Sequence, residues 1–273
     1  MVFEYIVRKI SDRHPSILFF YALCITPISL FLAYIIFPNL TSILFLFFMT
    51  IASVPTFYMF LREEEEVIEK LSGNTKEVIE SIFERNKKVI YAYAYFFLGS
   101  IVALTFLYTF LPKEYLSLFF KYQINTVDAI RGMAVLRGSD FATIFFNNVK
   151  VSFMAFLLSF FFGTGAIFVI SWNASIIATF FGSLSREYVS NGMCKFLAAI
   201  YGLTVGTLSI IIHGVPEILA YFVAGIAGGV LSLGIYKGKF TEEIIKDALL
   251  IYLFSVFLLL IAAFLEAYVT PLI

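Results

Sequence analysis

The residues of this chain that could do chemistry lie inside an almost continuous run of apolar sequence. They are three asparagines, one histidine and two glutamates: Asn147, Asn148, Asn173, His213, Glu217 and Glu266. A charged side chain at the centre of a membrane-spanning helix costs roughly 2.5–3.5 kcal/mol on insertion scales. We therefore expect these polar groups to be paired with one another or to be used in function.

His213 and Glu217 stand four residues apart in the segment His213-Gly214-Val215-Pro216-Glu217. Proline removes a backbone hydrogen bond and clashes with the preceding helical turn. We therefore predict a sharp turn here, with Pro216 at the first helical position and Glu217 in the first turn, where the helix dipole favours a carboxylate. An imidazole beside a carboxylate can also act as an acid–base pair, so an intramembrane enzyme using His213 and Glu217 is one alternative.

Other catalytic and metal-binding patterns are missing from the sequence. A zinc site needs three or four His, Cys, Asp or Glu ligands, and the only other histidine is His14. There is no HExxH motif, phosphate loop, dinucleotide fingerprint or Ser–His–Asp set. Cys24 and Cys194 each lie among apolar residues and are interpreted as packing residues. We predict no catalytic residue, no metal and no cofactor.

Composition places the chain in the membrane. Of 273 residues, 61% are hydrophobic and 14% are charged, against roughly 25% charged residues in soluble domains. The 34 Phe and 16 Tyr suit lipid-facing and interfacial positions. The formal net charge is zero, so no basic field points to nucleic acid. The lipid bilayer is the first partner that the sequence indicates.

The elements that position the polar residues are membrane helices. Seven windows are long enough to span at roughly 20 apolar residues each: 17–37, 41–61, 89–111, 149–171, 195–213, 215–236 and 248–268. No cleavage site follows the first window, so we expect an uncleaved anchor. An eighth apolar stretch, 174–184, is too short to span and predicts a re-entrant or interfacial segment. The fold class is an all-α polytopic transmembrane bundle.

Charge distribution predicts the orientation of the chain. If 174–184 does not cross, most of the 19 Lys and Arg residues lie on one side. The positive-inside rule then places the N-terminus in the cytoplasm and the C-terminus outside. The fourth window would end at Trp172-Asn173 at the inner interface, and Asn173 would cap the short segment 174–184.

Two regions between windows have amphipathic patterns. Residues 62–88 predict two short cytoplasmic helices, interpreted either as extensions of the flanking spans or as a docking surface, with Asn74 and Glu77 spaced as a capping box. On the outer side, within 112–138, residues 113–136 predict an amphipathic helix on the membrane surface. Ser139-Asp140 is then expected to cap a second short helix.

Small residues predict close contacts between helices. Gly163-Thr164-Gly165 falls in the middle of the window 149–171, and small-x3-small patterns indicate that windows 195–213 and 215–236 form a tight pair. The glycines expected at helix contacts are Gly163, Gly165, Gly182, Gly202, Gly206, Gly214, Gly225, Gly228 and Gly229. The same patterns serve within one protomer or in a homo-oligomer.

Several of these residues, in this order, resemble a known family. They are Asn147-Asn148, Gly163-x-Gly165, Trp172-Asn173 with Gly182, His213-Gly214-x-x-Glu217, Ala224-Gly225 with Gly228, and Glu266-Ala267-Tyr268-x-Thr270-Pro271. Together they resemble the stage II sporulation protein M family of bacterial and archaeal membrane proteins, over about residues 139–271. We accordingly divide the chain into an N-terminal three-span region, 1–138, and a family-like membrane domain, 139–273.

The resemblance implies a role in organising other proteins. In endospore-forming bacteria the namesake anchors a membrane complex that contains peptidoglycan-degrading enzymes and is not itself the hydrolase, and most family members come from organisms that make no spores. The leading hypothesis is a non-enzymatic membrane scaffold with protein partners. The alternative is a transporter or channel, in which Glu217, Asn147 and Asn173 would line a polar cavity.

Overall fold

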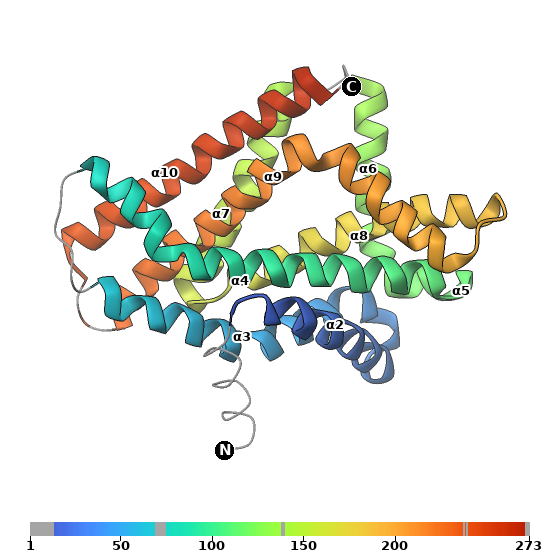
Figure 1. Cartoon of the computed structure of the whole chain (residues 1–273), viewed down its shortest axis with the longest axis horizontal. Helices are drawn as coiled ribbons and strands as arrows, with labels where there is room; N and C mark the ends of the chain where they lie inside the picture. Colours follow the sequence, from blue (N-terminus) through green and yellow to red (C-terminus); the bar gives the residue numbers. More distant parts are fainter. Residues whose placement is uncertain (1–13, 69–74, 138–139, 237, 239, 271–273) are drawn as a thin grey trace.

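The computed structural model describes residues 14–68, 75–137, 140–236, 238 and 240–270. Within these ranges the regular elements are helical (Figure 1). They are α2 (Ile17–Ile36), a 3-10 turn η1 (Pro38–Leu40), α3 (Thr41–Ile68), α4 (Thr75–Phe110), α5 (Lys113–Phe119), α6 (Lys121–Arg137), α7 (Phe141–Phe162), α8 (Ala166–Ser190), α9 (Lys195–Tyr236), α10 (Glu242–Phe264) and a π-helical turn η2 (Leu265–Val269).

Seven of the described helices are long and apolar enough to cross a membrane. They confirm the all-α polytopic class and the number of candidate spans, although the helices from α7 to α9 do not coincide with the sequence windows. α2, the first part of α3 and the second part of α4 correspond to the first three windows. The charge-based orientation of the chain stays a prediction.

The described residues of the cytoplasmic region predicted at 62–88 are extensions of the neighbouring helices. Its first residues continue α3 as far as Ile68, and its last residues belong to α4, which begins at Thr75. Of the two interpretations, helix extension is therefore the one that the backbone supports. The predicted capping box involves Asn74, which lies outside the described residues.

The predicted outer amphipathic helix, 113–136, is two helices, α5 and α6. The chain turns at Phe120, whose φ of −128° departs from helical values. The reason lies in packing, because Phe119 and Phe120 are both buried. Gln123 Nε2 donates to the backbone oxygen of Ser42 at 2.9 Å and fixes α6 to the start of α3. These helices therefore pack onto the spanning bundle.

The predicted fourth span, 149–171, is wrong, because the chain turns at Gly163. Gly163 has a φ of +70°, a left-handed conformation that glycine adopts without steric cost. α7 ends there and α8 begins at Ala166, whose N–H donates to Ser159 Oγ at 2.9 Å. Asp140 caps α7 by accepting from the Thr143 N–H at 3.3 Å, but the helix that follows is long rather than short.

The predicted re-entrant segment, 174–184, is also wrong. It is the middle of α8, a helix of 25 residues that is itself a candidate span. Trp172 and Asn173 lie inside this helix, and Asn173 does not cap a segment after it. α8 begins at Ala166, so its first apolar residues, 166–171, were assigned to the preceding span by the window 149–171. The remaining apolar stretch was then too short to be recognised as a span.

The predicted turn at Pro216 is wrong as well, because α9 is one helix of 42 residues with Pro216 inside it. At 1.5 Å per residue it is about 63 Å long, roughly twice the hydrocarbon thickness of a bilayer. Figure 1 shows that α9 bends into two arms. Proline causes helix bends, and membrane helices tolerate it because neighbouring groups satisfy the freed backbone.

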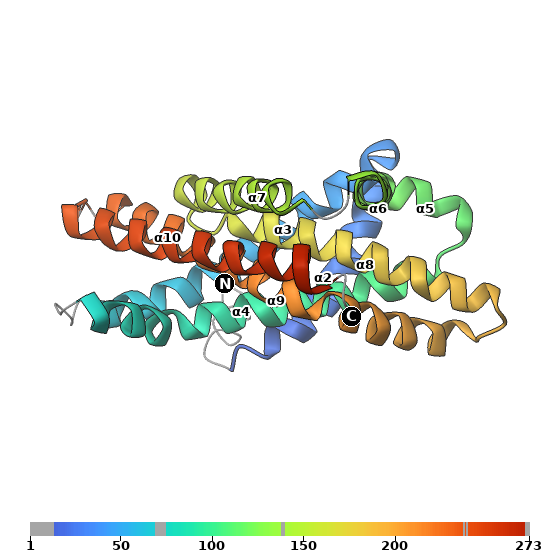
Figure 2. The same cartoon turned by 90° about the horizontal axis from the view of Figure 1, so that it is seen from above.

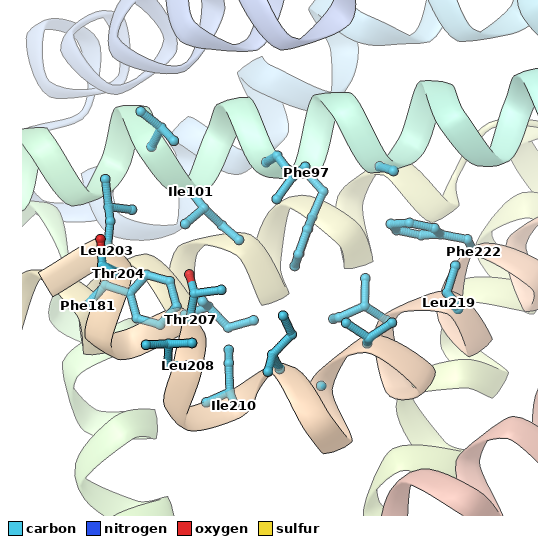
Figure 3. Close-up of a pocket in the computed structure, with 18 residues that line it drawn as sticks. Phe97, Ile101, Phe181, Leu203, Thr204, Thr207, Leu208, Ile210, Leu219 and Phe222 are labelled. Atoms are coloured by element: carbon cyan, nitrogen blue, oxygen red, sulfur yellow. The ribbon is translucent and has the colours of Figure 1, made fainter. Parts of the chain in front are cut away.

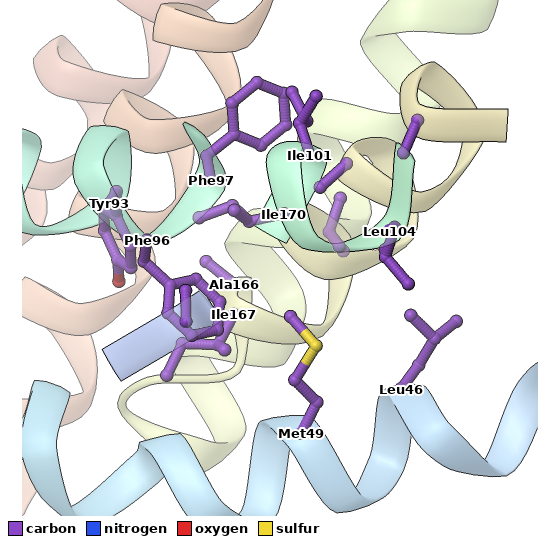
Figure 4. Close-up of a cluster of buried hydrophobic side chains, with 14 of the residues drawn as sticks. Leu46, Met49, Tyr93, Phe96, Phe97, Ile101, Leu104, Ala166, Ile167 and Ile170 are labelled. Atoms are coloured by element: carbon purple, nitrogen blue, oxygen red, sulfur yellow. The ribbon is translucent and has the colours of Figure 1, made fainter. Parts of the chain in front are cut away.

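The central core joins α3, α4 and α8. Figure 4 shows Met49 of α3, Phe96 and Ile101 of α4, and Ile167 and Ile170 of α8 meeting in one cluster of buried side chains. The core thus includes residues on both sides of the proposed boundary at 138–139, and the division into two regions stays a prediction. Seen from above, α7 and α10 run side by side in one half of the molecule (Figure 2).

Candidate functional site

A group of polar side chains lies between α9 and the C-terminal end of α10. His213 Nδ1 is 3.0 Å from Thr270 Oγ1, and the Tyr221 hydroxyl donates to Glu217 Oε1 at 2.7 Å. Glu266 lies close enough to both Glu217 and Tyr221 to interact with them electrostatically. We call these five residues the polar cluster.

The continuity of α9 explains half of this arrangement. Residues four apart on a helix share a face, so His213, Glu217 and Tyr221 form one stripe along α9. The predicted turn would have separated His213 from Glu217, whereas the unbroken helix aligns them.

The second half of the cluster comes from the end of α10. After Phe264 the helix widens into the π-helical turn Leu265–Val269, which contains Glu266. Thr270 Oγ1 donates to the backbone oxygen of Leu265 at 3.1 Å. Because a hydroxyl has one proton, Thr270 accepts from His213 Nδ1 whenever it donates to Leu265. The turn thus positions the partner of the histidine.

α7 covers the same region from a third side. Phe145 and Val149 pack against the buried residues Ala220, Tyr221 and Leu259. Asn148 lies on the same helical face, because it is three residues from Phe145 and one turn before Ser152. Its Nδ2 atom is buried and has no hydrogen-bond partner.

A serine pair joins α7 to α10 one helical turn after Asn148. Ser152 Oγ and Ser255 Oγ are 2.8 Å apart, and both residues are fully buried. α7 and α10 run antiparallel, since the ring of Phe141 also stacks on that of Tyr268 near the other end. Polar contacts therefore recur along the three-helix group of α7, α9 and α10.

Three of the predicted site residues, Asn147, Asn148 and Asn173, are not hydrogen-bonded to the polar cluster. Asn173 Nδ2 donates to the backbone oxygen of Val169 at 2.8 Å, within its own helix. Asn147 is exposed on α7. His213 and Glu217 are bonded to different partners, Thr270 and Tyr221. Of the six polar residues singled out from the sequence, the structure brings His213, Glu217 and Glu266 together.

Two cations close the C-terminal end of α4, which the sequence reasoning missed. Arg186 of α8 donates from Nε to the backbone oxygen of Tyr108 at 2.8 Å and from Nη2 to that of Leu111. Its guanidinium also lies 5.7 Å from the Tyr108 ring centroid. Lys195 Nζ is 3.4 Å from the backbone oxygen of Phe110. Cations at a helix C-terminus satisfy the last carbonyls and the dipole.

The glycines of α9 pack on two different helices, so the predicted pairing of windows 195–213 and 215–236 is wrong. On the N-terminal arm, a Cβ at Gly202 or Gly206 would collide with Phe181 of α8. On the C-terminal arm, a Cβ at Gly225 would collide with Ala166, and one at Gly228 with the backbone of Phe156. Both arms use glycine for close contact, but with α8 on one side and with α7 and the start of α8 on the other.

The other glycines divide by their surroundings. A Cβ at Gly182 would meet the Tyr108 ring of α4, one at Gly165 would meet Leu158, and one at Gly229 would lie 3.2 Å from the backbone oxygen of Gly163. Gly214, at the bend, differs from these. A Cβ there would meet only Ile210 of its own helix, at 3.7 Å. We conclude that Gly214 is not a packing glycine.

Near the bend lies a cavity of about 600 Å³ between α4, α8 and α9 (Figure 3). Phe97, Ile101, Phe181 and Phe222 line it together with aliphatic side chains, and Thr204 and Thr207 supply hydroxyls. No member of the polar cluster lines it. Within the described ranges, no three His, Cys, Asp or Glu side chains stand close enough to hold a metal ion.

Comparison with known proteins identifies the family. The model of the stage II sporulation protein M family matches residues 92–271, so the match begins within α4, well before the start at 139 expected from the sequence. An uncharacterized protein of Methanocaldococcus jannaschii is 32% identical over 139 residues, which cover 48% of this chain and 71% of that protein. No solved structure matches the chain. This protein is a multi-pass membrane protein that belongs to the stage II sporulation protein M family.

Proposed function

We propose that this protein is a non-enzymatic membrane scaffold that holds a partner protein at the surface formed by α5 and α6. The observation that carries the proposal is the way in which these two short helices are built. They are tied to the bundle by the buried Phe119 and Phe120 and by the hydrogen bond from Gln123 to α3. Several other side chains of the two helices are exposed.

These exposed residues have the composition of a protein-binding surface. Tyr115, Tyr122 and Ile130 are exposed by 40%, 42% and 50%, beside the exposed charged residues Lys121 and Asp128. Aromatic side chains within a polar rim are the usual anchors of protein interfaces. A surface fixed to the bundle also loses little conformational entropy when a partner binds. The family resemblance, whose namesake anchors a complex, supports the same conclusion.

Site-specific photo-crosslinking in native membranes tests this proposal. A benzophenone amino acid in place of Tyr115 or Tyr122 is expected to form a discrete adduct with one other polypeptide. The matched control is Phe257 of α10, which is 56% exposed and lies on a different helix. The same adducts from all three positions, or adducts with lipid alone from Tyr115 and Tyr122, would contradict the proposal.

The polar cluster favours a second candidate, a transporter or channel. Ionisable residues within membrane helices are often part of ion or proton pathways, and Glu217 and Glu266 interact inside the α7, α9 and α10 group. A liposome flux assay compares the wild type with Glu217→Gln, and with Glu243→Gln at the exposed start of α10 as the control. Flux that only Glu217→Gln abolishes would support transport, and flux unchanged by Glu217→Gln would count against it.

A further inference from the structure

The cavity beside the bend of α9 is a groove with an apolar floor and an apolar rim. Its floor includes the rings of Phe97, Phe181 and Phe222, which are exposed by 7%, 2% and 2%. Its rim includes Leu208 and Val215, which are exposed by 67% and 50%. Figure 3 shows Phe97 of α4 and Leu208 and Phe222 of α9 around the space between the two helices. We call this space the α4–α9 groove.

The groove exists because α9 bends. Its lining runs along α9 from Leu203 to Phe222 and includes Gly214, two residues before Pro216. At the two ends of the groove, α9 contacts α4 directly. The contacts are the Phe106–Phe196 ring pair and the Phe97–Phe222 ring pair. Between these contacts the two helices separate, and the resulting volume, about 600 Å³, is within the range of small-molecule sites.

The shape and lining of the groove suit a flexible hydrocarbon chain. A helix with side chains is about 10–12 Å wide and docks on small residues. Here the small-residue pattern Gly202-x3-Gly206 is already packed on α8, and the groove presents large aliphatic and aromatic side chains. An acyl chain can follow such an irregular surface, and the surrounding bilayer supplies it.

One end of the groove also offers a charge. This is the end nearer the N-terminus of α9, where Thr204 contributes a hydroxyl to the lining. Thr204 is nine residues after Lys195, or about 14 Å along the helix. Lys195 is exposed, and its ammonium lies beside the C-terminus of α4. A lipid phosphate at Lys195 would therefore lie beyond the Thr204 end of the apolar floor.

We propose that the α4–α9 groove binds one acyl chain of a phosphate-bearing membrane lipid, whose headgroup lies at Lys195. The site is independent of the scaffold surface on α5 and α6. The proposal explains why large aromatic rings form the floor of the groove. It also explains why α9 is bent, since a straight α9 would leave no groove.

Lipid titration of the purified, delipidated protein tests the proposal. Gly214→Phe fills the groove without a backbone clash, because a Cβ there meets only Ile210. Ser209→Phe is the matched control, on the same helix but outside the lining. Native mass spectrometry with phosphatidylglycerol is expected to show one tightly bound lipid in the wild type and in the control, and at least about tenfold weaker binding to Gly214→Phe. Equal binding to all three proteins would overturn the proposal.

The headgroup is tested separately with phosphatidylglycerol and phosphatidylcholine. An exposed ion pair contributes little, so Lys195→Gln is expected to weaken phosphatidylglycerol binding by about twofold to fivefold. Binding of the zwitterionic phosphatidylcholine is expected to change less. An equal loss for both lipids would place the headgroup elsewhere and overturn that part of the proposal.

A fluorescence measurement covers the case in which Gly214→Phe does not fold. Trp172 is the only tryptophan of the chain, so Trp172→Phe provides a silent background. Leu208→Trp then reports on the groove, and Phe257→Trp, at a similarly exposed position of α10, is the control. Quenching by a brominated acyl chain is expected at about one lipid per protein only for Leu208→Trp. The same lipid dependence at both positions would overturn the proposal.

Discussion

The close contact between α9 and α7 predicts opposite effects of the same substitution at two glycines of one helix. A Cβ at Gly228 would collide with the backbone oxygen and carbon of Phe156 and with the Phe160 nitrogen. Backbone atoms cannot rotate away, so α7 and α9 must separate. At Gly214 a Cβ would have ordinary contacts, 3.7 Å from Ile210.

The expected magnitudes follow from this difference. Replacing glycine by alanine inside a helix is favourable by about 1 kcal/mol when there is room. Gly214→Ala is therefore expected to leave the free energy of unfolding unchanged or to raise it by up to about 1 kcal/mol. Forcing an extra carbon into a packed contact costs about 1–3 kcal/mol. For Gly228→Ala the cost exceeds the gain, and we expect a net loss of about 1–2 kcal/mol.

Reversible unfolding by SDS in mixed micelles measures both free energies under identical conditions. The difference between the two variants isolates the clash, since the change in helix propensity is shared. Circular dichroism of the folded proteins shows whether helix content is preserved. If Gly228→Ala is as stable as Gly214→Ala, the packing of α9 on α7 described above is refuted.

Three further predictions use the same unfolding assay. Arg186→Gln removes charged hydrogen bonds to the last carbonyls of α4 and is expected to lower the free energy of unfolding by about 1–3 kcal/mol. Lys195→Gln, at an exposed position, is expected to lower it by less than about 1 kcal/mol. Equal losses would refute the assignment of Arg186 as the main cap. Glu217→Gln retains an acceptor for the buried Tyr221 hydroxyl and should be tolerated, while Glu217→Ala strands that hydroxyl at a cost of about 1–3 kcal/mol; an alanine variant as stable as the glutamine variant would contradict the pairing. A double-mutant cycle with Ser152→Ala and Ser255→Ala should give a coupling energy of about 0.6 kcal/mol, and a coupling of zero would mean that the two hydroxyls are not bonded.

The sequence was sufficient for the membrane class and for the first three helices. Their apolar windows are bounded by charges or by proline, so hydropathy locates the apolar part of each helix, although α3 and α4 extend beyond their windows. It failed at Gly163, because a hydropathy window adds up apolar residues and carries no information on φ. It failed again at Pro216, where a local rule from water-exposed helices gave way to a bent membrane helix.

The candidate site was predictable one residue at a time, but not as a group. Burial cost alone singled out His213, Glu217 and Glu266. Tyr221 was missed, although its spacing of four residues from Glu217 was a usable signal once α9 is continuous. Thr270 was part of the family resemblance but not of the predicted site. Its bond to His213 depends on the antiparallel packing of α9 and α10, which no local pattern specifies.

The measurement that tests the central claim most directly is purification of the tagged protein from its native membranes in mild detergent, with quantitative mass spectrometry of everything retained. The scaffold account predicts a partner protein in a fixed molar ratio, which is lost when Tyr115 and Tyr122 on the α5–α6 surface are replaced by Ser and is retained in Phe257→Ser. The account would be contradicted if the protein purified alone or only with copies of itself, and if every variant behaved alike.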